Sequence, residues 1–327
     1  MTAVRISYDA LLTNPSSVHE SISAAFGSAK GSLGAIFITD LPDTFPAQRA
    51  RLFHLAHVLG NLPPSVRESL SRPHTAYSFG WSHGKEVMNG KADTQKGSYY
   101  ANPLLDYPDV SDAQREAHPE YYAGNVWPDG VAGLEEFESA FKELGAFVAS
   151  VGVALARACE EFVAVPDRSI AQIITDSKAN KARLLHYYPS AASSHADSLC
   201  GTHLDHSLLT GLCSAMYLNA AGDPVPPPSP DAGLYIFPRG GGDAVQVKIP
   251  ADCLAFQMGE ALELLTGGKL AATPHFVSGG SGAEDVSREN FAFFLQPDVD
   301  DVIGPDGETF GQFTKRVLQR HYSDLGK

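Results

Sequence analysis

The stretches RLLHYY at residues 183–188 and LLTGLCSAMYL at residues 208–218 begin a series of short apolar segments that decides the fold class. Gly, Pro, Asn, Asp or Ser residues separate the segments, which is typical of strands in an all-β sandwich or jelly roll. The series continues over residues 233–237, 244–249, 253–258, 272–278 and 290–296. We therefore expect a jelly-roll core over residues 181–300.

One gap in this series is rich in proline. Residues 220–231 read AAGDPVPPPSPD, and proline has no N–H to donate to a neighbouring strand. This stretch is expected to be an exposed loop that joins two strands of the core.

The part of the chain before the core, residues 1–180, reads as a helical and mixed region. A strand is expected over 35–39 (AIFIT), a helix over roughly 46–60, and a loop rich in aromatic and polar groups over 77–102. The clearest helix lies between residues 134 and 162, where apolar residues recur at steps of three and four and so share one face. These residues are Leu134, Phe137, Phe141, Leu144, Val148, Val151 and Leu155.

A final helix is expected from about residue 310 to 322, within a C-terminal segment of residues 301–327. The whole chain, 1–327, is then one domain of the α+β class. Its core is mainly β structure, and helices flank that core.

Charge and composition narrow the classes of partner. The chain has 327 residues, with 24 Lys and Arg against 38 Asp and Glu, for a formal net charge of -14. An acidic surface repels nucleic-acid phosphates and anionic membranes, and no run of Lys and Arg interrupts it. No apolar run approaches the roughly 20 residues that span a bilayer. We expect a small-molecule partner, no nucleic acid and no membrane, and the sequence assigns no oligomeric state.

Cysteine usage and the first residues bear on the compartment. The four cysteines form no C-x-x-C pair, and four in a chain of this length are more simply free thiols than a disulfide framework. The start, MTAVRISYDALLTNPSS, lacks a basic region followed by an apolar stretch. Cytoplasmic localisation is the expectation.

The strongest local signal for chemistry is THLDH at residues 202–206. On a strand, residues i and i+2 point to the same face, so His203 and Asp205 would offer an imidazole nitrogen and a carboxylate oxygen to one metal ion. A neighbouring strand must supply the third ligand, and His275 in the segment ATPH is the natural candidate. Two histidines and one carboxylate leave coordination positions open, as in Fe(II) oxygenases.

An H-x-D pair alone is a weak signal, because two polar residues at this spacing are common. His206 is expected to face away from the pair by alternation. The remaining histidines are most simply solvated or packed, and they include His19, His54, His57, His118 and His321.

The surrounding motifs resemble the isopenicillin N synthase-like branch of the iron(II)/2-oxoglutarate-dependent dioxygenases. The similarity is carried, in order, by GWSHGKE at 80–86, HYYP at 186–189, THLDHSLL at 202–209, GLYI at 233–236, LAATPHFV at 270–277 and RENFAFF at 288–294. The resemblance implies a distorted double-stranded β-helix (jelly roll) with helices packed outside it.

The resemblance also implies roles for individual residues. His203, Asp205 and His275 would bind Fe(II), and Arg288 would bind the distal carboxylate of 2-oxoglutarate with help from Asn290 and Tyr188. A guanidinium suits this task because it meets a carboxylate with two parallel hydrogen bonds. Each charge-assisted bond contributes about 1.5–3 kcal/mol.

The chain departs from the family pattern at a few positions. Asn290 stands where the family usually has Ser, His186 replaces an Asn expected near the iron, and Phe276 replaces an Arg. Asp205, rather than Gly or Ala, favours oxygenation over halogenation. Residues expected in the substrate pocket or next to the ligands are His186, Tyr77, His83, Tyr99, Tyr100, Phe294 and Gln296.

The function implied is an Fe(II)- and 2-oxoglutarate-dependent oxygenase that uses O2 to oxidise, by default hydroxylate, a small organic substrate and releases succinate and CO2. Three alternatives remain open at this point. One is an Fe(II) oxidase of the same branch that does not consume 2-oxoglutarate, and another is a jelly-roll binding protein without catalysis. The third, a zinc hydrolase, is disfavoured because no Glu or His is evidently placed as a general base.

Overall fold

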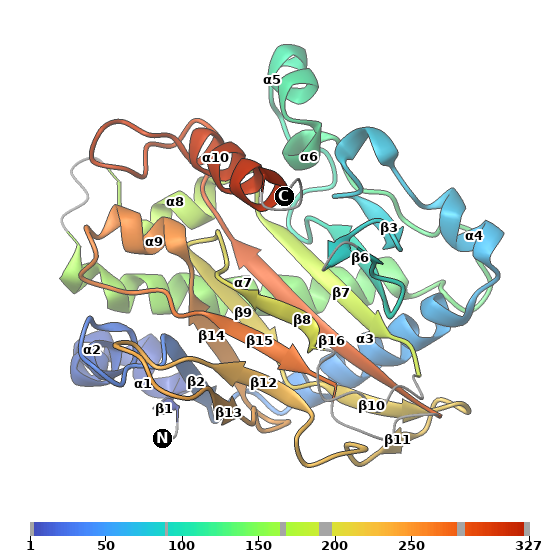
Figure 1. Ribbon diagram of the computed structural model, residues 1–327, viewed down its shortest axis with the longest axis horizontal. Coiled ribbons are helices and arrows are strands. Elements are labelled where there is room, and N and C mark those ends of the chain that lie inside the picture. Colours follow the sequence, from blue (N-terminus) through green and yellow to red (C-terminus); the bar gives the residue numbers. More distant parts are fainter. Residues whose placement is uncertain (1–2, 89–90, 164–167, 190–197, 280–284, 324–327) are drawn as a thin grey trace.

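The structure is a computed structural model, and it describes residues 3–88, 91–163, 168–189, 198–279 and 285–323. Two β-sheets and a set of helices build it (Figure 1). The strands of the larger sheet lie in the order β1-β2-β14-β9-β16-β7-β6-β3, and those of the smaller sheet in the order β13-β12-β15-β8. Mixed helices and sheets around a large antiparallel sheet confirm the expected α+β class.

The larger sheet has ten strands in the described part of the chain, and all its pairs are antiparallel except β1 with β2. Its strands are β1 (Val4–Ser7), β2 (Ala35–Thr39), β3 (Gly80–His83), β6 (Lys96–Ala101), β7 (Lys181–Tyr187), β9 (Leu209–Cys213), β10 (Met216–Asn219), β11 (Pro224–Val225), β14 (Leu254–Met258) and β16 (Val286–Leu295). The smaller sheet contains β8 (Ser198–His203), β12 (Gly233–Ile236), β13 (Val245–Val247) and β15 (His275–Ser278). A separate ribbon pairs β4 (Val87–Met88) with β5 (Lys91–Ala92).

The α-helices are α1 (Tyr8–Thr13), α2 (His19–Phe26), α3 (Thr44–Asn61), α4 (Pro64–Ser69), α5 (Asp112–Ala117), α6 (Pro119–Tyr122), α7 (Phe137–Cys159), α8 (Ile170–Asp176), α9 (Glu260–Leu265) and α10 (Phe310–Ser323). Short 3-10 helices are η1 (Pro15–Val18), η2 (Pro73–Thr75) and η3 (Glu160–Phe162).

Strand alternation sorts the core of the larger sheet into two layers. In β2, Ile36 and Ile38 belong to the apolar cluster shared with helices α3 and α7, whereas Ala35 and Phe37 belong to the cluster shared with β12 and β13 of the smaller sheet. The larger sheet is therefore buried on both faces here, with the smaller sheet on one side and helices on the other (Figure 1). This arrangement leaves the space between the two sheets as the place for a site.

Helix α7 packs along the back of the larger sheet. Its apolar face is buried as the spacing predicted, and Gly152 lets it approach β16 closely, since a Cβ there would lie 2.1 Å from Leu295 Cδ1. The stretch Phe137–Phe162 is long and apolar enough to cross a membrane by length and composition, contrary to the expectation that no segment would be. In the structure, 61% of its apolar window is buried inside the protein, as in the core helix of a soluble protein.

Most of the predicted elements are present, and the differences have physical causes. The segment 77–102 was expected to be a loop, which is wrong, because β6 in this segment pairs along its length with β7. The expected strand 208–218 is two strands, β9 and β10. They part at a bend where Arg49 Nη1 donates to the Ser214 carbonyl at 2.6 Å. The loop 220–231 also contributes the edge strand β11.

Candidate metal centre and adjoining cavity

His203, Asp205 and His275 converge at one end of the smaller sheet. The Cα atoms of His203 on β8 and His275 on β15 are register partners, and the two ring centroids lie 4.4 Å apart. Asp205 Oδ1 lies 3.6 Å from His203 Nε2 and 3.8 Å from His275 Nε2. The structure thus brings together the three residues that the sequence predicts as metal ligands.

Strand alternation was only part of the reason for this convergence. β8 ends at His203, and Asp205 lies in the turn that follows. The Asp205 carbonyl accepts a hydrogen bond from the Glu260 backbone N–H at 2.8 Å, at the start of α9. The start of a helix from another part of the chain therefore holds the backbone of Asp205 in place.

Each imidazole is oriented through its other ring nitrogen. His203 Nδ1 lies 2.7 Å from the Gly201 carbonyl, and His275 Nδ1 lies 3.3 Å from the Thr273 carbonyl. A carbonyl can only accept, so Nδ1 carries the proton in each contact and leaves the Nε2 lone pair toward Asp205. Metal-bound histidines in proteins are held in this way.

The charges at the centre favour ligation. Burial would raise the pKa of Asp205, but His275 and His203 outweigh it and hold that pKa well below its ordinary value. Burial would lower the pKa of His203, whereas hydrogen bonds with Asp205 and Cys200 raise it to about 11. Burial lowers the pKa of His275. Asp205 is thus an ionised carboxylate between two imidazoles, which is the state in which it can bind a metal ion.

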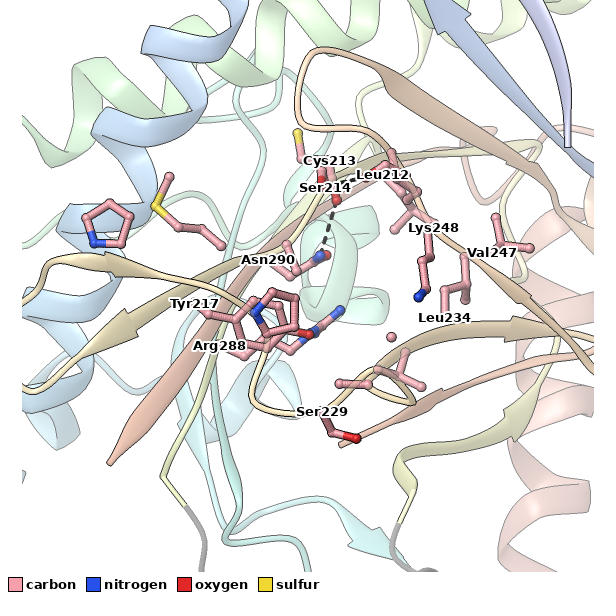
Figure 2. A pocket seen from close by; sticks show the side chains of 18 of the residues that line it. Leu212, Cys213, Ser214, Tyr217, Ser229, Leu234, Val247, Lys248, Arg288 and Asn290 are labelled. Carbon is pink, nitrogen blue, oxygen red and sulfur yellow. Dashed lines mark hydrogen bonds between the residues drawn. The ribbon is translucent and has the colours of Figure 1, made fainter. Parts of the chain in front are cut away.

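A cavity of about 600 Å³ lies between the two sheets. The larger sheet contributes Leu212, Arg288 and Asn290 to its wall, and the smaller sheet contributes Leu234 and Val277. Figure 2 shows Arg288 and Asn290 on one side of the cavity and Leu234, Val247 and Lys248 on the other. Val277 is two residues along β15 from His275, so the cavity and the metal centre share a strand.

Arg288 is the charged group in this wall that the sequence singled out. It is only 8% exposed, and its Nε finds no hydrogen-bond partner in the described part of the chain. Its Cζ lies 5.0 Å from the centroid of the Tyr187 ring. A buried guanidinium with an unused Nε donor is costly unless an anion meets it, so the cavity is suited to a carboxylate.

Asn290 takes part in the same wall. Its Nδ2 donates to the Cys213 carbonyl at 3.2 Å. The amide nitrogen thus already donates a hydrogen bond within the protein, although the residue lines the cavity as expected.

His186 and Tyr188 lie on the opposite side of the larger sheet from the cavity. The Tyr188 hydroxyl donates to the Gly60 carbonyl at 3.1 Å, and His186 Nδ1 lies 2.8 Å from Glu289 Oε1. These contacts place both residues against α3, which corrects the positions expected for them near the iron and the cosubstrate. The reason is alternation along β7, which turns Tyr187 toward Arg288 and its neighbours away.

Some of the residues expected to line the substrate pocket have other contacts, and the others face the space between the sheets. Among the former, Tyr99 is fully buried against Phe137 of α7 and belongs to the core. The Gln296 side chain donates to the Ala179 carbonyl, and His83 Nε2 lies 3.0 Å from the Thr94 carbonyl. Tyr77 packs under Lys85, whose Nζ lies 5.3 Å from the ring centroid.

Tyr100 and Phe294 lie on strand faces that turn toward the space between the sheets. Phe294 on β16 has the same strand parity as Arg288 and Asn290. The Tyr100 hydroxyl donates to Glu86 Oε1 at 3.2 Å, and the Arg183 Cζ lies 5.1 Å from the Tyr100 ring centroid.

Sequence reasoning missed a charged network around Tyr100. Lys96 Nζ lies 3.0 Å from Glu86 Oε2, and Arg183 forms an ion pair with Glu86 Oε1. Burial would raise the pKa of Glu86, but Arg183 and Lys96 lower it to about 2. Alternation in KGSYYA at 96–101 is the signal that could have revealed this network, but the segment was interpreted as a loop.

Comparisons with known proteins agree with this arrangement at the level of the fold. No family model matches the sequence, and neither does any curated protein. A solved structure described as a 2OG-Fe(II) oxygenase family protein from Caulobacter crescentus matches with a TM-score of 0.76 and 20% identity, over 98% of this chain and 100% of that chain. The fold is that of the 2OG-Fe(II) oxygenases.

Two further structures with this oxygenase fold differ more in sequence. A full-length Neurospora crassa protein in complex with alpha-KG matches with a TM-score of 0.69 and 16% identity, over 96% of this chain and 95% of that chain. A dioxygenase for auxin oxidation in rice matches with a TM-score of 0.65 and 13% identity, over 98% of this chain and 96% of that chain.

The donor set in this oxygenase fold fits iron(II). Two imidazole nitrogens and one carboxylate oxygen lie within 4.8 Å of one another, and this is the set of donor atoms that non-haem Fe(II) oxygenases use. In the described residues, His203, Asp205 and His275 form one of two such groups of metal-ligating side chains.

Proposed function

We propose that this protein is an Fe(II)- and 2-oxoglutarate-dependent oxygenase of the isopenicillin N synthase-like branch. One observation carries the proposal. Two histidines and an aspartate, with ligand atoms within 4.8 Å of one another, share strand β15 with a cavity whose wall holds a buried arginine, and no ion pair of this arginine is found among the described residues. We further infer that the two sheets form a distorted double-stranded β-helix around this cavity.

His203, Asp205 and His275 would hold the iron. Iron bound there supplies the chemistry that couples the use of O2 and 2-oxoglutarate to oxidation of a substrate, with succinate and CO2 as co-products. The carbonyls of Gly201 and Thr273 keep both imidazoles in the tautomer that offers Nε2.

Arg288 would bind the distal carboxylate of 2-oxoglutarate. The Tyr187 ring packs on the guanidinium, and the Nε donor of Arg288 has no hydrogen-bond partner in the described part of the chain. The apolar walls from Leu212, Leu234 and Val277 exclude water and thereby strengthen this contact.

The substrate is proposed to be a small organic molecule, oxidised by hydroxylation. Structures with the same fold contain small molecules such as thymine with alpha-KG, or JA with 2OG and Fe. The network of Lys96, Arg183, Glu86 and Tyr100 offers both charges and a phenol for recognising a polar substrate. The net charge of -14 supports a partner other than nucleic acid or an anionic membrane, and we propose the cytoplasm as the compartment.

The test is an anaerobic titration of the purified chain with Fe(II) and 2-oxoglutarate. The wild-type chain should develop a visible charge-transfer band, and His275→Ala should not. Absence of the band in the wild type, or its persistence in the variant, would contradict the proposal. Measuring succinate formed per O2 consumed then separates this function from an Fe(II) oxidase that does not use 2-oxoglutarate.

A further inference from the structure

A second group of metal-ligating side chains lies between the larger sheet and helix α3. His186 on β7 and Glu289 on β16 are register partners on the face opposite to Tyr187 and Arg288, and His57 reaches them from α3. The Glu289 side chain is 0% exposed, that of His186 is 2% exposed, and that of His57 is 14% exposed. This group is separate from the metal centre between the sheets.

The ligand atoms of the group are already close together. His186 Nδ1 lies 2.8 Å from Glu289 Oε1 and 3.1 Å from Oε2, and His57 Nδ1 lies 3.7 Å from Oε1. One ligand atom from each residue falls within 4.8 Å of the others. The Ser287 hydroxyl lies 3.0 Å from His57 Nδ1 and donates to Glu289 Oε1 at 2.8 Å.

The buried polar atoms of this group lack a full set of partners. The fully buried Glu289 carboxylate contacts His186 Nδ1 and the Ser287 hydroxyl, and it lies 3.7 Å from His57 Nδ1. Among the described residues, no Lys or Arg forms an ion pair with Glu289. His186 Nε2 is buried and has no hydrogen-bond partner in the same part of the chain. A buried anion without a full cationic partner is costly.

The surroundings hold the His186 ring in a fixed place. A Cβ added to Gly60 of α3 would lie 2.4 Å from His186 Cδ2, so the helix backbone packs directly on the imidazole. The Tyr188 ring meets it edge-on, with centroids 4.6 Å apart. Fixed ligands lose little freedom on binding, and the part of His57 that remains exposed offers a path of entry.

We propose that His57, His186 and Glu289 form a second metal site, which binds a divalent transition ion such as Zn(II). Two imidazole nitrogens and a carboxylate oxygen are donors that Zn(II) takes in proteins, with a further oxygen completing the set. The Ser287 hydroxyl lies next to the proposed site as such an oxygen. The ion neutralises Glu289 and links α3 to β7 and β16, so its role is structural.

The alternative is that these residues form a hydrogen-bonded cluster that binds no metal. Zinc stoichiometry separates the two. Apo protein prepared with a chelator is titrated with Zn(II) by calorimetry, and bound zinc is counted after gel filtration. The wild-type chain should bind two ions, and the His203→Ala/His275→Ala variant should bind one.

Adding His57→Ala to that double variant should remove the remaining ion and the rise in Tm that zinc produces. His54→Ala is the matched control, because His54 lies on the same helix and its Nδ1 bonds to the Ala50 carbonyl at 2.7 Å. The His54→Ala triple variant should keep the ion. A single zinc in the wild type that the double variant loses, none in the double variant, or retention after His57→Ala would overturn the proposal. The wild-type count stands even if a variant fails to fold.

Discussion

The ring of Tyr187 lies against the guanidinium of Arg288, with 5.0 Å between the arginine Cζ and the ring centroid. The two residues are register partners on β7 and β16, and Arg288 lines the cavity between the sheets. A stacked aromatic ring restrains a guanidinium without occupying its N–H donors. Arg288 is therefore prepared to bind a carboxylate before one arrives.

Replacing Arg288 tests its role in binding the cosubstrate. Arg288→Met removes two charge-assisted hydrogen bonds of about 1.5–3 kcal/mol each, so we expect the Kd for 2-oxoglutarate to rise at least about 100-fold. Titration of the Fe(II) complex with 2-oxoglutarate measures this. Arg51→Met is the control, since Arg51 pairs with Glu136 and Glu143 on the surface. An unchanged Kd in Arg288→Met would show that another group binds the carboxylate.

The two adjacent tyrosines allow a matched comparison. Tyr187→Leu removes the stacking on Arg288, and cation–π contacts contribute about 0.5–2 kcal/mol. We expect 2-oxoglutarate to bind roughly 3- to 10-fold more weakly. Tyr188→Leu should leave this affinity unchanged, because Tyr188 contacts Gly60 and Arg67 on the other side of the sheet. The same titration measures both variants. A larger effect of Tyr188→Leu would favour the prediction from the sequence that Tyr188 helps to bind 2-oxoglutarate.

Gly60 should accept no side chain while His186 is present. A Cβ there would lie 2.4 Å from His186 Cδ2, and overpacking of this kind costs about 1–3 kcal/mol. We expect Gly60→Ala to lower the free energy of unfolding by that amount in urea denaturation. The same substitution should cost less in a His186→Ala background, because the clashing ring is gone. Equal costs in the two backgrounds would mean that the clash lies elsewhere.

The buried side chain of Lys181 should make the free energy of unfolding depend on pH. Its side chain is buried, its Nζ lies 4.1 Å from the Phe79 ring centroid, and burial lowers its pKa from 10.5 to about 7. The unfolded chain binds this proton more strongly, so between about pH 7 and 10.5 the folded state gains stability as the pH rises.

We expect Lys181→Met to raise the free energy of unfolding, relative to wild type, by more at pH 7 than at pH 10. The difference between the two pH values is of the order of a few kcal/mol, since each pKa unit corresponds to about 1.4 kcal/mol. Urea denaturation at both pH values measures it. Lys30→Met, at an exposed position, serves as the control. Equal effects of Lys181→Met at the two pH values would contradict the expectation.

Local patterns in the sequence were enough for elements whose packing follows one simple period. The apolar spacing from Phe137 onward predicted α7, and the punctuated apolar runs predicted most strands of both sheets. The H-x-D pair and a distant histidine, together with the motifs around them, predicted which side chains meet, and they meet because β8 and β15 are neighbours.

Features that depend on long-range contacts were not accessible in this way. Strand β6 pairs with β7, and β3 pairs with β6 in turn, so both strands depend on long-range pairing, and their own sequences, GWSH and KGSYYA, form no continuous apolar run. The faces of His186 and Tyr188 depend on where β7 begins and on its register with β16. His57 was interpreted as an ordinary packed or solvated histidine, since nothing local indicates that Glu289 lies opposite it.

Strand β16 contributes side chains to both faces of the larger sheet. Arg288 and Asn290 line the cavity, and Glu289 between them points to His57 and His186. The insertion or deletion of one residue at the start of this strand would exchange the two faces. A carboxylate would then enter the cavity, and the arginine would lie against α3. An evolutionary change in the length of this strand would therefore disrupt the cavity and the proposed second metal site together, so the two must evolve under a shared constraint.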